Sequence, residues 1–105
     1  MKNISPAELK SELASGRRMQ LLDVRENWEF QTARIDGSAL IPMGEIQARM
    51  SELDPASETV VICHHGGRSM QVAMFLERQG FSSVHNLAGG VDAWARSVDP
   101  SMPTY

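Results

Sequence analysis

The sequence predicts a single α/β domain in which a parallel β-sheet is covered by helices on both faces. Its 105 residues suit one hydrophobic core, since such domains typically have about 100–150 residues. Short apolar runs of strand length alternate with segments of helical pattern, which is typical of right-handed βαβ units. The β-branched run Thr59–Ile62 carries no charge, as expected of a central strand that is buried on both faces.

The first half of the chain begins with a helix. Ser5 is followed by a proline at the first helical position and by Glu8, a capping pattern that starts a helix from Pro6 to about Ser15. Gly16 ends this helix. The segments that follow are predicted as a strand over Met19–Val24, a short helical turn over Asn27–Thr32, and a strand over Ser38–Ile41 that stops at Pro42.

The second half repeats the alternation. We expect a helix over Met43–Leu53, the central strand Thr59–Ile62, a helix from Arg68 or Ser69 to Gln79, a strand over Ser83–Leu87, and a helix over Val91–Ser97. Met70 and Met74 lie at helical spacing and are expected on a packed face. The tail contains Pro100 and Pro103 and is expected to be irregular.

Composition excludes several classes of function. The net charge of −3 and the pI near 5.5 argue against a nucleic-acid partner, which would require a basic stripe. No apolar run reaches the 18–20 residues of a membrane span, and the first residues lack the apolar centre of a signal peptide. A single cysteine cannot form an internal disulfide. We therefore expect a cytoplasmic protein whose Cys63 is a free thiol.

Cys63 directly follows the central strand, and ligands of open parallel sheets bind at the carboxyl ends of strands. The loop from His64 to Arg68 contains two glycines, and a helix begins at its far side. Its N–H groups are therefore expected to turn inward as an anion-binding nest, with Ser69 at its end. The helix N-terminus favours a thiolate, which is the nucleophilic form of cysteine. Cys63 is thus the candidate catalytic residue, with His64, His65, Gly66, Gly67, Arg68 and Ser69 as candidate substrate-binding residues.

Other interpretations of these residues are less favourable. A lone cysteine after Val-Val-Ile is by default a buried small hydrophobe, but that role needs no glycine pair, arginine or helix start. A metal site formed by Cys63, His64, His65 and His85 is disfavoured because adjacent loop residues lack the usual ligand spacing. We predict neither a metal nor a cofactor. His64 and His65 could be solvent-exposed loop residues, and His85, on a strand, is expected to be structural.

Two further groups of residues are expected to have structural roles. Trp28 and Trp94 belong to a small set of aromatic residues that a domain of this size usually places in its core. Asp23, Arg25 and Glu26 follow a strand; they could form an acid/base set, but an ion-pair network at the strand end is favoured. Asp23 and Arg25 are accordingly predicted as supporting residues of the site.

Four motifs in order resemble the rhodanese-like sulfurtransferases, in particular the compact single-domain thiosulfate sulfurtransferases. The motifs are Leu22-Asp23-Val24-Arg25-Glu26 with Trp28-Glu29-Phe30, Ile35-Asp36-Gly37-Ser38 leading to Ile41-Pro42, the Cys63–Ser69 loop, and Asn86–Trp94. The resemblance covers nearly the whole chain. It implies one rhodanese-like domain over residues 1–105, with a parallel sheet of about five strands whose first strand lies near Lys2–Ile4.

The same resemblance implies a mechanism. Cys63 would attack the outer sulfur of a donor such as thiosulfate, hold it as a persulfide within the loop, and pass it to cyanide or to a cellular thiol such as thioredoxin or glutathione. Apart from Arg68, this loop departs from the family by offering His64 and His65 in place of lysines or arginines; we expect them to steer anionic donors, with a charge that depends on pH. Arg34 stands where many relatives have histidine, and its role is left open.

Two rival functions follow from the same family. Related cysteine phosphatases separate cysteine and arginine by five residues to wrap a tetrahedral phosphate or arsenate, whereas four residues separate Cys63 from Arg68 here. The shorter loop favours a single sulfur atom over a phosphate. Rhodanese-like domains also serve as non-catalytic docking modules, but retention of the cysteine and a full-length loop favours catalysis.

Overall fold

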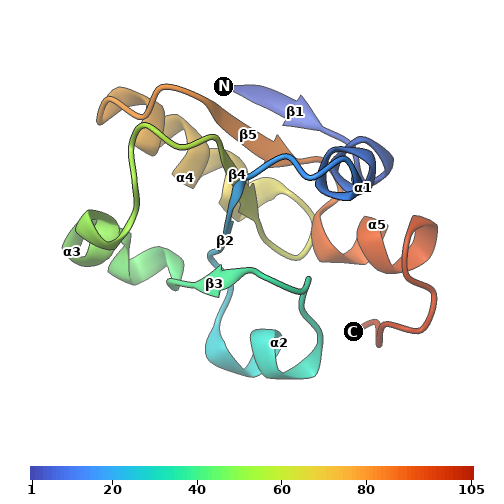
Figure 1. The fold of residues 1–105 in the computed structure, drawn as a ribbon. Coiled ribbons are helices and arrows are strands. Elements are labelled where there is room, and N and C mark those ends of the chain that lie inside the picture. Colours follow the sequence, from blue (N-terminus) through green and yellow to red (C-terminus); the bar gives the residue numbers. More distant parts are fainter.

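The computed structural model describes all 105 residues as a five-stranded, all-parallel sheet in the order β1-β5-β4-β2-β3 (Figure 1). Its strands are β1 (Lys2–Ile4), β2 (Gln20–Asp23), β3 (Ala39–Leu40), β4 (Thr59–Ile62) and β5 (Val84–Leu87). The predicted α/β fold is confirmed, including the short first strand. All four residues of β4 are buried, as the sequence pattern predicts for a central strand.

Helices cover both faces of this sheet. They are α1 (Pro6–Ala14), α2 (Asn27–Thr32), α3 (Ile46–Arg49), α4 (Gly67–Arg78) and α5 (Gly90–Ser97). Residues of β4 alternate between two apolar cores: Val61 packs with residues of α3 and α4, and Val60 packs with residues of α1 and α5. Cys63 belongs to the first core. None of the helices has the length and apolar character needed to cross a bilayer.

The prediction of one continuous helix over Met43–Leu53 is wrong. Instead, 3₁₀ turns over Met43–Glu45 and Met50–Glu52 flank the single α-helical turn of α3. Only Ile46 and Leu53 are buried in this stretch, so no continuous apolar stripe holds a longer helix against the sheet. Gly44, near its start, weakens the helix further.

Two predicted core residues lie at the surface. Trp94 is buried as expected, but Trp28 is 61% exposed and Met74 is 47% exposed. Helix α2 has only six residues, and the one it buries is Glu29, so Trp28 faces outward. On α4 the buried stripe runs through Val72, Ala73 and Leu76, which leaves Met74 on the outer side.

Candidate active site

Cys63 lies immediately after β4, at the carboxyl end of the central strand, and its side chain is 1% exposed. The backbone N–H of Gly66 donates to Cys63 Sγ over 3.1 Å. The hydroxyl of Ser69, in the first turn of α4, lies 3.2 Å from the same sulfur. Both groups can donate to a sulfur anion, and charge-assisted hydrogen bonds of this kind are stronger than neutral ones.

A buried amide holds both of these donors in place. Asn86 of β5 accepts a short hydrogen bond from the Ser69 hydroxyl and donates to the Gly66 carbonyl over 3.3 Å. It also donates to the side chain of Asn3 in β1 over 3.2 Å. The Ser69 hydroxyl has one proton, so it can donate either to Asn86 or to Cys63 Sγ. Donation can therefore shift toward the sulfur when the sulfur becomes an anion.

The start of α5 supports the loop from behind. The N–H of Val91 donates to the Cys63 carbonyl over 2.9 Å, and that of Asp92 donates to the His64 carbonyl over 3.1 Å. Gly90, with φ of 62°, packs so closely that a β-carbon there would lie 2.3 Å from the Cys63 oxygen and 2.4 Å from the His64 oxygen. Only glycine permits this contact.

Arg68 forms a two-pronged ion pair with Glu29 of α2, with N–O distances of 2.7 and 2.9 Å. Glu29 is 3% exposed, and its hydrogen bonds from Arg68 lower the pKa of its carboxyl group to about 2. The Arg68 guanidinium is therefore opposed by a full negative charge. Its main effect is to fix the loop against α2, because the nearby carboxylate reduces its positive field at the sulfur.

Asp23 and Arg25 form the predicted ion pair at the end of β2, and both side chains are fully buried. The Arg25 Nη2 atom lies 2.7 Å from Asp23 Oδ2 and also donates to the Ala33 carbonyl over 2.6 Å. Glu26 lies outside this pair and precedes α2 as its capping residue. The ion-pair interpretation is thus confirmed for Asp23 and Arg25 alone.

The two loop histidines differ in environment. His64 is half-buried, its Nε2 atom is covered and has no hydrogen-bond partner, and its ring stacks on Tyr105 at 3.9 Å. Burial, assisted by neighbouring His65, lowers the pKa of His64 below its usual range. The His65 side chain is 68% exposed, and its Nδ1 lies 4.0 Å from Asp92. His64 therefore gains the expected steering charge only at more acidic pH than an exposed histidine would.

Comparisons with known proteins agree with this geometry. Residues 5–97 match the family described as Rhodanese-like domain. The chain belongs to the rhodanese-like domain family. Among its relatives, the protein named "Putative sulfurtransferase YtwF" from Bacillus subtilis is 40% identical, over 95% of this chain and 96% of that protein. The Rhodanese-like/PpiC domain-containing protein 12 of Arabidopsis thaliana is 42% identical over the whole chain, which spans only 38% of its length.

Solved structures show the same rhodanese-like fold. A rhodanese-like domain protein from Staphylococcus aureus has a TM-score of 0.86 and 30% identity, with 100% of this chain and 99% of that one covered. The human single-domain sulfurtransferase TSTD1 has a TM-score of 0.80 and 30% identity, over 92% and 97% of the two chains. The domain therefore has the same fold as these proteins, and its cysteine loop lies at the carboxyl end of the central strand, as predicted.

The structure brings most of the candidate residues of this rhodanese-like domain together. Gly66 and Ser69 contact the Cys63 sulfur, and Arg68 anchors the loop, while Gly67 begins α4 and His65 points to solvent. The structural role predicted for His85 is confirmed, since it pairs with Glu58 at 2.8 Å near the amino ends of the strands. Arg34, whose role was left open, is exposed and lies over the ring of Phe30.

Sequence reasoning missed four residues of the site: Glu29, Asn86, Gly90 and Tyr105. Asn86, Gly89 and Gly90 lie in a motif that the family resemblance had already marked, and a glycine pair at a strand end indicates close backbone approach. Glu29 also lies in such a motif. No sequence signal pointed to Tyr105, whose contacts depend entirely on the tertiary structure.

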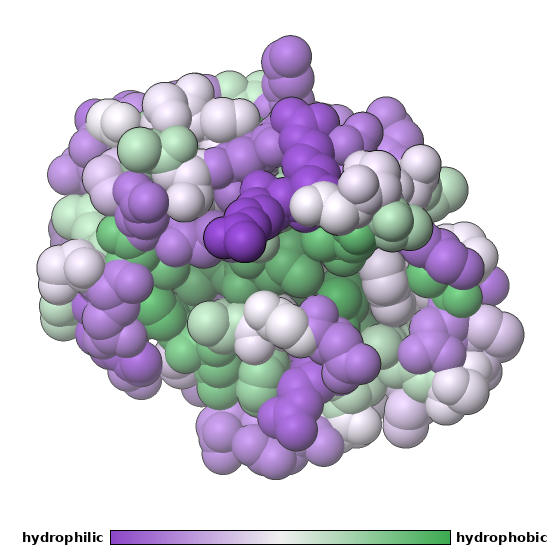
Figure 2. Space-filling model, viewed as in Figure 1, coloured by the Kyte–Doolittle hydropathy of each residue, from purple (hydrophilic) through white to green (hydrophobic).

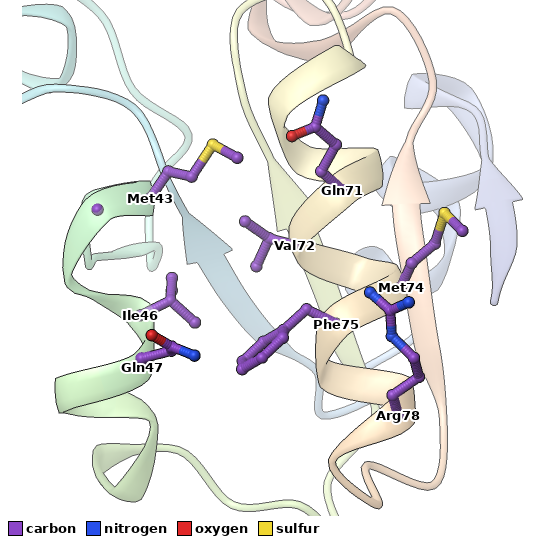
Figure 3. Close-up of a pocket in the computed structure, with 9 residues that line it drawn as sticks. Met43, Ile46, Gln47, Gln71, Val72, Met74, Phe75 and Arg78 are labelled. Atoms are coloured by element: carbon purple, nitrogen blue, oxygen red, sulfur yellow. The ribbon is translucent and has the colours of Figure 1, made fainter.

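The hollows of the domain lie away from the sulfur. A cavity of about 540 Å³ lies between α3 and α4, where Met43, Ile46, Val72 and Phe75 line it (Figure 3). The space-filling view shows an apolar band through the middle of this face (Figure 2). Two other cavities, of about 610 and 380 Å³, are lined by residues near the amino ends of the strands and beside α5. Cys63 lines none of the three.

Proposed function

We propose that this rhodanese-like domain is a sulfurtransferase that carries sulfane sulfur on Cys63, with thiosulfate as a donor and a cyanide ion or cellular thiol as the acceptor. One observation carries the proposal: a cysteine sulfur at the end of the central strand, with the Gly66 N–H and the Ser69 hydroxyl in contact with it. The names of the Bacillus subtilis and human relatives support sulfur transfer as the general chemistry.

In the first half-reaction, the Cys63 thiolate attacks the outer sulfur of thiosulfate. A sulfur–sulfur bond forms to Cys63 as the original bond in thiosulfate breaks, and the bonding electron pair leaves with sulfite. The Cys63 persulfide keeps one negative charge on its terminal sulfur. The Gly66 N–H and the Ser69 hydroxyl, which flank the cysteine sulfur, are positioned to stabilise this anion.

In the second half-reaction, an acceptor thiolate attacks the terminal sulfur of the persulfide. The acceptor becomes a persulfide itself, and the electron pair of the broken bond returns to Cys63 as a thiolate. Cyanide would react in the same way and give thiocyanate. Because neither half-reaction needs an external oxidant or reductant, the domain requires no redox cofactor in this scheme. A reducing compartment such as the cytoplasm would keep Cys63 free for it.

The test is direct detection of the intermediate. Incubation with thiosulfate, followed by intact-mass measurement, should show one added sulfur atom that is lost on reduction and absent from Cys63→Ser. Ser69→Ala is expected to form the adduct about tenfold more slowly, since one hydrogen bond to the reacting sulfur is lost. Wild-type protein that gains no sulfur from thiosulfate or any other sulfane donor would disprove the proposal.

Acceptor preference is measured in a second step. The purified persulfide form is mixed with thioredoxin, glutathione or cyanide, and the loss of the added sulfur is followed by mass. The fastest acceptor defines the class of physiological partner. Preserved cellular function of Cys63→Ser would favour the docking-module alternative, and faster turnover of an aryl phosphate or arsenate than of thiosulfate would favour a phosphatase or reductase.

A further inference from the structure

The last segment of the chain crosses from one side of the site to the other. Residues 99–105, here called the strap, begin beside α5, where the Asp99 N–H donates to the Trp94 carbonyl over 3.0 Å and Met102 packs on the α1/α5 core. Figure 1 shows that the strap ends beside α2. Between these points, Pro103 and Thr104 are exposed and form no backbone hydrogen bond.

Tyr105 anchors the far end of the strap. Its hydroxyl accepts a hydrogen bond from Arg25 Nη1 over 2.7 Å and donates one to Glu29 Oε2 over 2.9 Å. Burial and the Glu29 contact raise the pKa of Tyr105 to about 12, which keeps this donor protonated. The ring stacks on His64 with an interplanar angle of 7°, and it forms an edge contact with Trp28 at a centroid distance of 5.5 Å.

These contacts place Tyr105 over the residues that surround the cysteine loop. His64 adjoins Cys63, and Glu29 holds the loop through Arg68. Cys63 is 1% exposed, and it lines none of the three cavities. A sulfur in this state is closed to both donor and acceptor, so some part of its cover must move before reaction.

The strap packs against this loop through the Tyr105 ring on His64, and its departure leaves the neighbouring ion pairs in place. When Tyr105 departs, Arg25 keeps its pairing with Asp23, and Glu29 keeps its two contacts with Arg68. No buried charge is then left unpaired. An unpaired buried charge is what would make other movements in this region costly. Thr104 is exposed and forms no backbone hydrogen bond, so rotation about its backbone can carry Tyr105 away without breaking one.

We propose that Tyr105 gates the cysteine loop: the strap closes the site through the Tyr105 contacts with Arg25, Glu29 and His64, and its opening sets which reactants reach Cys63. Large acceptors, such as a protein thiol, require the strap to open fully, whereas small ones require a smaller displacement. This inference rests on the proposed role of Cys63 as the sulfur carrier, but access to the cysteine can be measured without any sulfur donor.

The experiment compares how fast two reagents alkylate Cys63. The small reagent is iodoacetamide, and the bulky one is a maleimide attached to a polymer of about 5 kDa, on the order of a small protein in size. The readout is the ratio of the bulky to the small rate constant in the intact chain. Tyr105→Ala should raise this ratio about tenfold, because a charge-assisted hydrogen bond and the aromatic contacts are lost. Tyr105→Phe keeps the ring and should raise it by about threefold.

Matched controls separate gating from general loosening. Met74→Ala removes exposed apolar surface on the outer side of α4, touches none of the Tyr105 contacts, and should leave the ratio unchanged. Global unfolding exposes the cysteine to both reagents, so adding mild urea to wild type shows how far unfolding alone moves the ratio. A Tyr105→Ala ratio within the range of these controls would overturn the gate.

The result is independent of the sulfur chemistry. A raised ratio in Tyr105→Ala, combined with no sulfur adduct from any donor, would preserve the gate and refute the proposed function. An adduct on wild type, combined with an unchanged ratio in Tyr105→Ala, would support the proposed function and refute the gate. Where both hold, Tyr105→Ala should also speed sulfur transfer to thioredoxin more than transfer to cyanide.

Discussion

Both ends of the sheet carry a network of ion pairs, but the network at the carboxyl end is more deeply buried. At the amino end, Glu58 pairs with His85 and with Arg17, whose side chain is 50% exposed, beside the cavity of about 610 Å³. At the carboxyl end, Arg25 is fully buried and Glu29 nearly so, with no cavity at the neighbouring Cys63. The cavity of about 610 Å³ thus lies at the end of the sheet opposite Cys63.

This contrast shows which feature marks the site. Exposed ion pairs add little to stability and need no functional explanation. Burying an arginine and two carboxylates costs free energy that apolar side chains of similar volume would not cost. Here they hold α2 against the cysteine loop through the Arg68–Glu29 pair. Buried charge beneath the loop identifies the site better than cavity volume does.

The sharpest test of the contrast compares an arginine from each end. Arg25→Ala leaves the fully buried Asp23 carboxylate without its partner, which should lower the free energy of unfolding by about 3–5 kcal/mol. Arg17→Ala breaks exposed pairs and should cost at most about 1 kcal/mol. Urea denaturation of both variants measures this difference. Equal losses would mean that burial does not separate the two networks.

A pair of glycines extends the comparison from charge to backbone. Gly90→Ala forces a β-carbon against the carbonyls of Cys63 and His64, so the loop must shift and persulfide formation should slow by roughly tenfold to a hundredfold. Gly16→Ala, at the amino end, has a φ of 85° but free space around its β-carbon. It should cost about 1 kcal/mol of stability and leave the rate unchanged. Rates that fall equally in both variants would contradict the close-contact argument.

Acidic pH should selectively weaken the ion pairs at the carboxyl ends of the strands. The pKa of Glu29 falls from 4.5 to about 2 in the folded state, so its stabilising effect is complete above about pH 5 and disappears as the pH falls toward 2. The loss should amount to about 2 kcal/mol once solvent screening at the partly exposed Arg68 is included.

The matching variants are Glu29→Gln and Glu58→Gln, followed by unfolding at several pH values between 2 and 6. Glu29→Gln should lose this part of the acid dependence, whereas Glu58→Gln, altered at the amino end, should keep it. If Glu29→Gln retained the full wild-type acid dependence, another carboxyl group would have to be responsible.

The sequence predicted those parts of the molecule that depend on local pattern. The β4 run, the capped first helix and the cysteine loop each combine propensity, spacing and turn residues over a few positions. The Asp23–Arg25 pair could also be predicted from the sequence, because both residues lie at the end of one strand. Such features need no knowledge of the tertiary fold.

The remaining features depend on distant segments meeting. Glu29 meets Arg68, and Tyr105 meets Arg25, only after the sheet has formed, so no spacing in the sequence encodes either contact. Trp28 was misplaced for the same reason: its helix buries a carboxylate against the loop and turns the indole outward. The interrupted helix at Met43–Leu53 likewise reflects how little of that segment the core can bury.

The smallest expected effect concerns His64, which the sequence assigned to donor steering. Burial lowers the pKa of His64, so its positive charge develops only at more acidic pH than in an exposed histidine. The nearest fixed positive charge, Arg68, is already opposed by Glu29, and the His65 side chain points to solvent. The KM for thiosulfate should therefore change by less than about twofold between pH 7 and 8, with kcat determined separately to account for the thiol.

His64→Gln and His65→Gln should match wild type over this range, because neither removes an unopposed charge near the sulfur. A decrease in KM below pH 6 that disappears in His64→Gln would assign the charge to His64 under acid alone, consistent with its lowered pKa. If KM instead rose several-fold between pH 7 and 8 and His64→Gln removed that rise, His64 would be protonated at neutral pH. Its stacked and covered position beneath Tyr105 would then have to differ in solution, which would weaken the gate as well.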